Sequence, residues 1–242
     1  MLNKQSGNMY GFVTHTWNPI KGKCPHECIY CYMKRYPQGD LRLDEKCFKD
    51  NLGTNNIIFV GSSTDMFAED VPWVWIKETI AHCNTSPNNT YLFQTKNPAR
   101  FYQFRMDFHK NHILATTIET DKEIPNLSKA PFTRRLSPRH KTPKRMISIE
   151  PVLDFTDRFY LSISEMNPDM VSIGADSKGN NLPEPSSKMI LHLMSMLGEE
   201  YNIKLFIKPN LKRLIGKESY IMLSEKYNPH CRTGIIYTST PN

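Results

Sequence analysis

The strongest constraint on the fold is a repeated alternation of short apolar segments with longer segments of helical spacing. Each short segment is rich in apolar and β-branched residues and ends abruptly in polar residues, which is typical of a buried strand. Strands that alternate with helices are expected to run parallel and to be joined by right-handed crossovers. The seven predicted strands span residues 11–17, 56–63, 90–96, 112–119, 145–151, 169–176 and 203–209.

The longer segments have the apolar spacing of amphipathic helices. The clearest spans residues 183–200, where apolar residues recur on one face, Ser186 or Ser187 can cap the start, and Gly198 marks the end. The other predicted helices span residues 71–83, 97–110 and 156–167.

Seven such units in 242 residues predict one α/β domain over residues 1–242, built as a partial or complete (β/α) barrel. A flat doubly wound sheet is the alternative, because periodicity does not distinguish the two. No apolar run is long enough to predict a membrane span. The first residues lack the apolar core of a signal peptide, so we expect a cytoplasmic protein with reduced thiols.

Polar side chains gather where the predicted strands end. In (β/α) barrels the active site lies at the carboxyl ends of the strands, so these residues are candidates for one shared site. A carboxylate this close to a buried strand end also needs a partner. The candidates are Ser62, Ser63, Asp65, Gln94, Thr95, Lys96, Thr117, Glu119, Ser148, Glu150, Asp176 and Lys208.

Three of the six cysteines stand at the spacing C-x3-C-x2-C, after the first predicted strand. An odd number of thiols in one short loop does not suit disulfide pairing and indicates a soft metal group. A [4Fe–4S] cluster normally takes four cysteines, and Cys24, Cys28 and Cys31 would leave one iron open to another ligand. The alternative is zinc, with His26 or His15 as the fourth ligand. The other cysteines stand alone and are expected to be small buried side chains: Cys47, Cys83 and Cys231.

The stretch CPHECIYC, residues 24–31, resembles the signature of the radical SAM superfamily, C-x3-C-x-aromatic-C, with Tyr30 in the aromatic place. The stretches TWNP, FVGSSTDMF, FQTKNPARF and SIEPVLDF resemble those of a phage- and prophage-associated branch, loosely akin to the spore photoproduct lyases. In order along the chain, these matches cover roughly residues 10–210. The resemblance implies a (β/α) barrel of the radical SAM type.

The resemblance also implies a reaction and its cofactors. A [4Fe–4S] cluster on Cys24, Cys28 and Cys31 would reduce S-adenosylmethionine, and the resulting 5′-deoxyadenosyl radical would take a hydrogen atom from the substrate. An electron donor such as flavodoxin or ferredoxin would supply the electron. The positions implied for the amino group of S-adenosylmethionine are Ser62, Ser63 and Asp65, where GSSTD replaces the usual Gly-Glu. The other positions implied for this cofactor are Tyr30, Thr117, Glu119, Ser148 and Glu150.

The net charge of +7 favours a polyanionic partner, because Lys and Arg gain affinity for phosphates by releasing counterions. Basic residues near the predicted site suggest a landing surface for a nucleic acid backbone, although they also suit charge compensation of an anionic cluster. They are Lys21, Lys23, Lys34, Arg35, Lys96, Arg100 and the segment 208–213. A second basic segment, residues 133–145, is expected to be solvated surface.

The predicted substrate is therefore a base of DNA or RNA that is modified or repaired. The residues predicted to act on the substrate side are Lys96, Asp154, Asp176 and Lys208. Two alternatives stay open: a radical SAM enzyme that acts on a peptide or small metabolite, and a non-catalytic zinc-binding nucleic acid protein.

Overall fold

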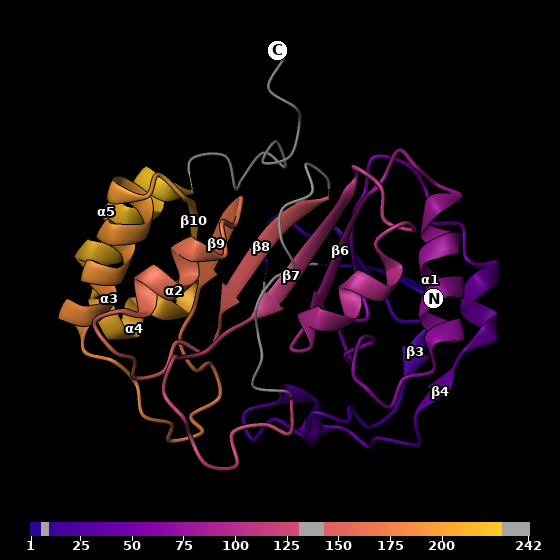
Figure 1. The fold of residues 1–242 in the computed structure, drawn as a ribbon, viewed down its shortest axis with the longest axis horizontal. Coiled ribbons are helices and arrows are strands. Elements are labelled where there is room, and N and C mark those ends of the chain that lie inside the picture. Colours follow the sequence, from indigo (N-terminus) through magenta and orange to yellow (C-terminus); the bar gives the residue numbers. More distant parts are fainter. Residues whose placement is uncertain (6–9, 131–142, 229–242) are drawn as a thin grey trace.

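The computed structural model of the chain describes residues 1–5, 10–130 and 143–228. Its main feature is an eight-stranded sheet in the order β1-β2-β5-β6-β7-β8-β9-β10 (Figure 1). Strand β1 runs antiparallel to β2, and the other neighbouring pairs run parallel. The strands of this sheet are β1 (Leu2–Lys4), β2 (His15–Trp17), β5 (Ile57–Val60), β6 (Thr90–Thr95), β7 (His112–Thr117), β8 (Lys144–Ile149), β9 (Met170–Ile173) and β10 (Lys204–Ile207).

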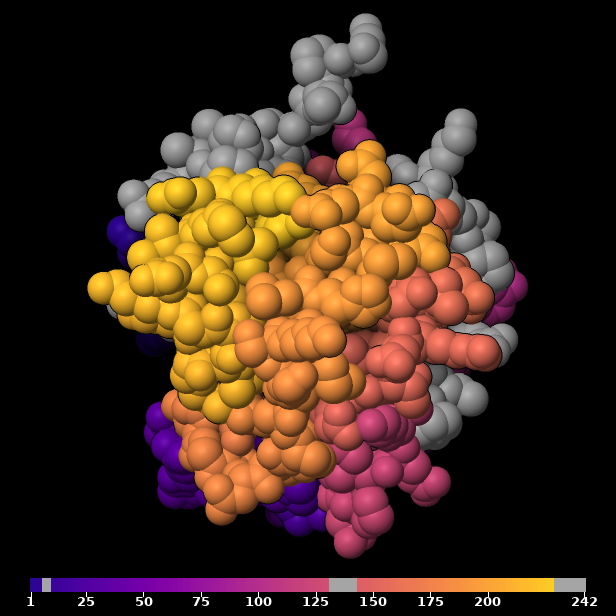
Figure 2. All heavy atoms as spheres, turned by 90° about the vertical axis from the view of Figure 1, so that its left-hand side faces the viewer, coloured from indigo at the N-terminus to yellow at the C-terminus, as the bar shows by residue number. Residues whose placement is uncertain are grey.

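The connecting segments hold the helices and one small hairpin. The helices are α1 (Trp73–Asn84), α2 (Phe159–Glu165), α3 (Ser187–Ser195), α4 (Lys212–Ile215) and α5 (Lys217–Tyr227). Short 3-10 turns form η1 (Tyr32–Arg35), η2 (Glu45–Lys49), η3 (Pro98–Phe104) and η5 (Pro209–Leu211), and a π-helical turn, η4 (Met196–Glu200), continues α3. The hairpin joins β3 (Ile20–Lys21) to β4 (Arg42–Leu43). Figure 2 shows the outer surface that α3 and α5 build at one end of the sheet.

The sheet is curled, so the fold is a partial (β/α) barrel rather than a flat doubly wound sheet. The Tyr10 ring lies 6.1 Å from the ring of Phe59 on β5 and 6.5 Å from that of Phe206 on β10. The two phenyl rings are therefore no further apart than the sum of these distances. In a flat sheet, the five steps of about 4.8 Å from β5 to β10 would separate them by about 24 Å.

The interior of the curl is filled by apolar side chains. Phe12 stacks on Tyr10 at 5.3 Å between ring centroids and meets Phe206 edge-on at 5.5 Å. Alternate residues of the parallel strands complete this buried cluster: Ile57, Phe59, Leu92, Ile113, Ala115, Met146, Met170 and Phe206. Because side chains alternate between the faces of a strand, the next inward positions lie at the carboxyl ends, and these are polar.

The convex face packs against the helices in two further clusters. One joins α1, through Ile76 and Ile80, to the strands at the β5 side, and the other joins α3, through Ile190 and Leu193, to the strands at the β9 side. Cys47 and Cys83 are buried in the first of these clusters, as predicted. Cys231 lies outside the described residues.

All seven predicted parallel strands are present. The first is shorter than predicted, because β2 covers only His15–Trp17 of residues 11–17, and β8 begins one residue earlier than expected. The helix predicted over residues 97–110 is wrong, since only the 3-10 turn η3 forms there. Asn97 does not cap the segment, because its side-chain amide donates instead to the carbonyl of Phe67 at 3.3 Å. Arg100 is also drawn inward, where its guanidinium donates to the carbonyls of Ala68 and Val71. These long-range contacts hold the backbone in a tighter winding than an α-helix.

The predicted helix at residues 183–200 is confirmed, with Ser186 as its cap: the serine hydroxyl accepts from the Met189 amide at 3.3 Å. The expected end at Gly198 is wrong, because η4 carries the winding on to Glu200. A Cβ at Gly198 would lie 2.8 Å from the Tyr227 ring. The glycine therefore serves the close approach of α5 rather than a helix end. Within the described part of the chain, no helix is both long and apolar enough to cross a membrane.

One buried histidine gives the fold a dependence on pH. His112 starts β7 with its side chain fully buried among aromatic rings, including those of Phe93 and Phe108. Its Nδ1 accepts from the His109 amide at 3.2 Å, which requires a neutral ring. Burial, with a smaller effect of His109, lowers the pKa of His112 to about 4.

Because the folded pKa of His112 lies below its unfolded value of about 6.5, the unfolded state binds the extra proton between these values. The free energy of unfolding should thus fall by about 3 kcal/mol as pH drops from 6.5 to 4. His112→Gln, which keeps an acceptor and does not titrate, should make this fall shallower in urea titrations. His192→Gln changes a histidine exposed on α3 and is the control. Equal pH profiles for wild type and His112→Gln would contradict this account.

Candidate active site

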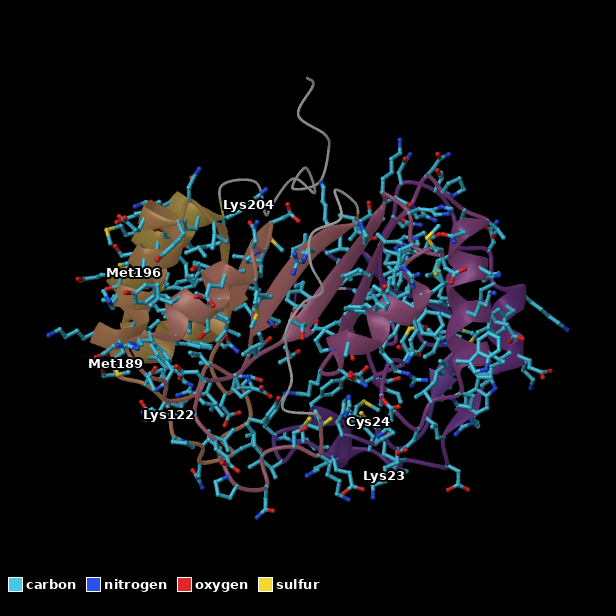
Figure 3. The ribbon with its side chains drawn as sticks, in the orientation of Figure 1. Lys23, Cys24, Lys122, Met189, Met196 and Lys204 are labelled. Carbon is cyan, nitrogen blue, oxygen red and sulfur yellow. The ribbon has the colours of Figure 1, made fainter. Side chains whose placement is uncertain are left out.

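The carboxyl ends of the parallel strands surround one cavity of about 750 Å³. Most of the predicted site residues line it: Cys24, Cys28, Tyr30, Cys31, Ser62, Ser63, Asp65, Lys96, Thr117, Glu150, Asp176 and Lys208. Glu119 and Ser148 are fully buried behind the lining, and Asp154 lies away from it. Figure 3 shows Cys24 below the strand ends, on the open side of the curled sheet.

The loop with the three cysteines is held against a distant segment of the chain, residues 127–130. The Ile29 amide donates to the carbonyl of Leu127 at 3.0 Å, and the amide of Lys129 donates to the carbonyl of His26 at 2.7 Å. The Cys28 thiol donates to the Ser128 hydroxyl at 3.4 Å. Cys24, Cys28 and Cys31 are all free thiols. The loop is thus fixed by backbone contacts while its sulfurs remain unbridged.

The surroundings of Cys24 and Cys31 favour the neutral thiol. Burial, together with the nearby Asp65 carboxylate, raises the pKa of Cys24 to about 12. Burial also raises the pKa of Cys31. Among the described residues, no three or more His, Cys, Asp or Glu side chains converge on a point where a single metal ion would sit.

Asp65 joins the cysteine loop to the ends of β5 and β6. Its carboxylate accepts from the amide of Phe67 at 3.0 Å and, at the end of β6, from the Thr95 hydroxyl at 3.0 Å and the Lys96 amide at 2.8 Å. The Nε2 atom of His26 lies 2.9 Å from the same carboxylate, out of line for a hydrogen bond. Through these hydrogen bonds Asp65 fixes the segments after β5 and β6 to each other, and the His26 ring lies against its carboxylate.

Ser62 and Ser63 are tied to Asn18, which follows β2. The Ser62 hydroxyl donates to the Asn18 side-chain oxygen at 3.1 Å, and the Ser63 amide approaches the same atom at 3.3 Å. Gly61 begins this turn with φ of +75°, a backbone conformation that favours glycine. Asn18 therefore fixes the turn GSSTD, residues 61–65, to the segment that follows β2.

In the cavity wall, Tyr30 and Lys96 form a largely buried polar group with Glu119. The Lys96 ammonium donates to the Glu119 carboxylate and to the Tyr30 hydroxyl, and that hydroxyl donates to Glu119. Glu119 is fully buried, and Lys96 is nearly so. An ion pair this deep is costly to separate, because either charge left alone would remain unsolvated. The group holds Tyr30, the aromatic place of the cysteine motif, against the ends of β6 and β7.

A second buried group lies across the cavity. The Lys208 ammonium donates to Glu150, and the Asn210 amide donates to the other oxygen of that carboxylate at 3.2 Å. Burial lowers the pKa of Lys208, although the Glu150 charge opposes this. The Lys208 ammonium also lies 4.5 Å from the centre of the Tyr10 ring. A Cβ at Gly174 would lie 2.7 Å from the Lys208 side chain and 2.9 Å from Glu150, so this group needs a glycine there.

Hydrogen bonds link the polar side chains at the floor of the cavity to one another. The Tyr10 hydroxyl lies 2.8 Å from Gln94 Oε1 and 2.8 Å from Ser148 Oγ, so it donates to the first and accepts from the second. The Gln94 amide then donates to the Thr117 hydroxyl at 2.8 Å. Burial, with the Glu150 charge, raises the pKa of Tyr10 and keeps the phenol neutral. Ser148 therefore acts on the cavity through its hydrogen bond to Tyr10.

The two predicted aspartates differ in their placement. Asp176 accepts from the amides of Lys178 and Asn180 at 3.1 and 2.5 Å, which shapes the loop after β9. Burial tends to raise the pKa of Asp176, but these hydrogen bonds and Arg213 outweigh it and hold the pKa below the ordinary value. Asp154 is about 40% exposed and pairs with Lys122 at 2.6 Å. It does not reach the cavity.

Several of the predicted rim cations are already occupied. Arg100, Lys96 and Lys208 are buried and bound to the protein groups described above. Lys21 pairs with Asp44, and Arg213 pairs with Glu184. Of the second basic segment, residues 133–142 lie outside the described residues. The predicted landing surface is therefore smaller than the sequence indicated.

Sequence reasoning missed four residues that shape the site. They are Tyr10, Asn18, Gly174 and Asn210. Asn18 and Asn210 stand one or more positions beyond a strand end, next to Pro19 and Pro209. An asparagine beside a proline after a strand is a usable signal, because both favour a turn.

Replacing Gly174 with alanine should separate Lys208 from Glu150, since the new Cβ would overlap both. We expect Gly174→Ala to lower the free energy of unfolding by about 1–3 kcal/mol, the usual cost of overpacking. Gly39→Ala is the control, because the nearest atom to its Cβ is the mobile end of the Arg42 side chain at 3.2 Å. Urea unfolding measures both, and equal losses would contradict a special role for Gly174.

Comparison with solved structures finds the same fold in spore photoproduct lyase. A cysteine-to-serine mutant of that enzyme matches with a TM-score of 0.59 and 10% identity, over 86% of this chain and 79% of that chain. Spore photoproduct lyase complexed with dinucleoside spore photoproduct matches with a TM-score of 0.51 and 9% identity, over 82% and 64%. A mutant with bound AdoMet and dinucleoside spore photoproduct matches with a TM-score of 0.50 and 10% identity, over 77% and 62%. At this identity the likeness shows the fold alone, a partial (β/α) barrel.

No curated protein matches this sequence. One family model does match, over residues 39–188, which is more than half of the chain. The matched region begins after the cysteine loop and includes the ends of β5 to β9. The chain belongs to the family described as protein of unknown function DUF5131.

Proposed function

We propose that this protein is a radical SAM enzyme that acts on a nucleic acid base. The observation that carries the proposal is the position of Cys24, Cys28 and Cys31. They come from one braced loop and line the cavity at the carboxyl ends of the parallel strands, where barrel enzymes have their active sites.

The residues present fit a [4Fe–4S] cluster better than a single zinc ion. Ligands of one zinc ion each lie about 2.0–2.3 Å from the metal, so they converge on one point, and the described residues show no such set. In a cluster each cysteine binds a different iron, so the thiols can stand further apart. His26, the nearest candidate for a fourth zinc ligand, faces Asp65. Three thiols without a fourth ligand would leave one iron for S-adenosylmethionine.

When bound, the cluster and S-adenosylmethionine would together supply a 5′-deoxyadenosyl radical. The chain's own residues would position and shield these groups. Tyr30, Lys96 and Glu119 hold the cysteine loop to the sheet, and Thr117, Ser62 and Ser63 line the cavity. We assign these three residues to cofactor contacts, with Asp65 as their support.

Glu150, Lys208 and Asn210 lie on the opposite wall and would contact the cofactor or the substrate. We assign Lys208 and Asp176 to the substrate side, because both line the cavity from the segments that follow β10 and β9. Asp154 is left out of this assignment, since its carboxylate pairs with Lys122 outside the cavity.

A nucleic acid substrate is supported by charge and by structural likeness. The net charge is +7, and spore photoproduct lyase, which shares the fold, has been solved with a dinucleoside photoproduct. A base that reacts in the cavity must leave its stack, at a cost of a few kcal/mol. We further propose a flavodoxin or ferredoxin as electron donor, because the reaction needs one electron per cleavage.

Anaerobic reconstitution with iron and sulfide tests the proposal. We expect a brown protein that forms 5′-deoxyadenosine when dithionite and S-adenosylmethionine are added. Cys28→Ala should lose at least 100-fold in this rate, or about 2.7 kcal/mol of activation free energy, together with most of its iron. Cys83→Ala, which changes a buried cysteine of α1, is the matched control and should keep both.

A colourless protein that holds one zinc ion would contradict the proposal. Undiminished deoxyadenosine formation by Cys28→Ala would contradict the assignment of the cysteine loop.

A further inference from the structure

Three exposed cations near the mouth of the cavity have no carboxylate partner among the described residues. Among the described residues, the ion-paired cations of this region are Lys21, Lys23, Lys122, Lys129 and Arg213. Lys34, Arg35 and Lys178 have no carboxylate within ion-pair distance in the described part of the chain, and all three are exposed. Exposed and unpaired cations are the ones able to bind phosphates.

The turn η1 carries two of these cations across the open side of the barrel. At one end, the Tyr32 hydroxyl donates to the carbonyl of Ser62, beyond β5, at 3.0 Å. At the other end, the Arg35 guanidinium reaches the carbonyl of Lys178, beyond β9, at 3.5 Å. The turn therefore bridges two strand ends that are far apart in the sheet order.

Aromatic rings flank the same cations. Tyr32 is 40% exposed and Tyr36 is 59% exposed, although large aromatic side chains usually bury most of their surface. No acidic residue occurs between them. We call Tyr32, Lys34, Arg35, Tyr36 and Lys178 the η1 rim.

We propose that the η1 rim is the docking surface for single-stranded nucleic acid. The inference deepens the proposed function, and it rests on that function because the strand would be its substrate. Bases of a single strand expose faces that stack on aromatic rings, while cations follow the phosphates. In a duplex these faces are covered by neighbouring bases, and η1 is too short to fill a groove as a recognition helix does. A strand held on the rim would place an unstacked base directly over the cavity.

The test is fluorescence anisotropy with the full chain and a labelled single strand of about 16 nucleotides, as DNA and as RNA. Tyr36→Ala should weaken binding roughly 5- to 100-fold, the range expected for the loss of one stacked base. Tyr36→Phe keeps the ring and should bind within about twofold of wild type. Tyr102→Ala removes another exposed tyrosine, on η3, and should have no effect.

Salt titration separates phosphate contacts from general charge. Each phosphate contact with a single strand contributes about 0.7 to the slope of log K against log salt. The double variant Lys34→Ala/Arg35→Ala should therefore lower the slope by about 1.4. Lys188→Ala/Lys217→Ala removes the same net charge from the exposed faces of α3 and α5, and it should keep the wild-type slope.

Three outcomes would overturn the inference. The first is that the rim variants bind the single strand like wild type. The second is that a duplex of the same sequence binds more tightly than the single strand. The third is that the rim variants impair only the reduction of the protein by an acidic electron-donor protein.

The two proposals fail separately. Rim-dependent strand binding by a wild-type protein that forms no deoxyadenosine would sink the proposed function alone. Deoxyadenosine formation with rim-independent binding would sink this inference alone.

Discussion

The curl of the parallel sheet around Tyr10 and Phe12 is the constraint on which the rest of the structure depends. Tyr10 contacts Phe59 on β5, and both rings contact Phe206 on β10, five strands further along the sheet. Because the apolar cluster fills the interior from one end, the polar residues at the carboxyl ends are left around a single opening. Without the curl, Asp65 beyond β5 and Lys208 beyond β10 would lie on opposite ends of a flat sheet. With it, both line one cavity.

The cavity wall is built from charged groups that are expensive to bury. Lys96 with Glu119 and Lys208 with Glu150 are ion pairs at strand ends. Breaking a buried pair by removing one partner typically costs about 3–5 kcal/mol, whereas a well-packed apolar replacement is often neutral. The stability of the fold alone therefore does not account for these buried ion pairs. They do fix the loops that carry Tyr30 and Asn210, and so they give the cavity a defined shape.

The sequence predicted the features that depend on local pattern. The parallel strands were found because each is a short apolar run with a polar end, and the strand-end rule placed Lys96, Glu150 and Lys208 at one edge. The cysteine loop was found from spacing alone. Its brace on residues 127–130 was not predicted, because that contact joins backbone groups about 100 positions apart and leaves no trace in composition.

Contacts between residues far apart in the sequence also explain the predictions that were wrong. Arg100 looks like a rim cation in the sequence, and only the fold shows that it caps the carbonyls of Ala68 and Val71. Those contacts also prevent the predicted helix at η3. The three protein donors to Asp65 are likewise visible only in the fold, and its contact with a cofactor stays a prediction. Whether a polar side chain is available depends on its tertiary partners, which periodicity does not encode.

Mössbauer spectroscopy of protein reconstituted with ⁵⁷Fe tests the central claim most directly. With three cysteine ligands, one iron of the cube differs from the others, and adding S-adenosylmethionine should change the spectrum of that iron alone. Four equivalent irons that do not respond to S-adenosylmethionine, or a preparation without a cluster, would contradict the account.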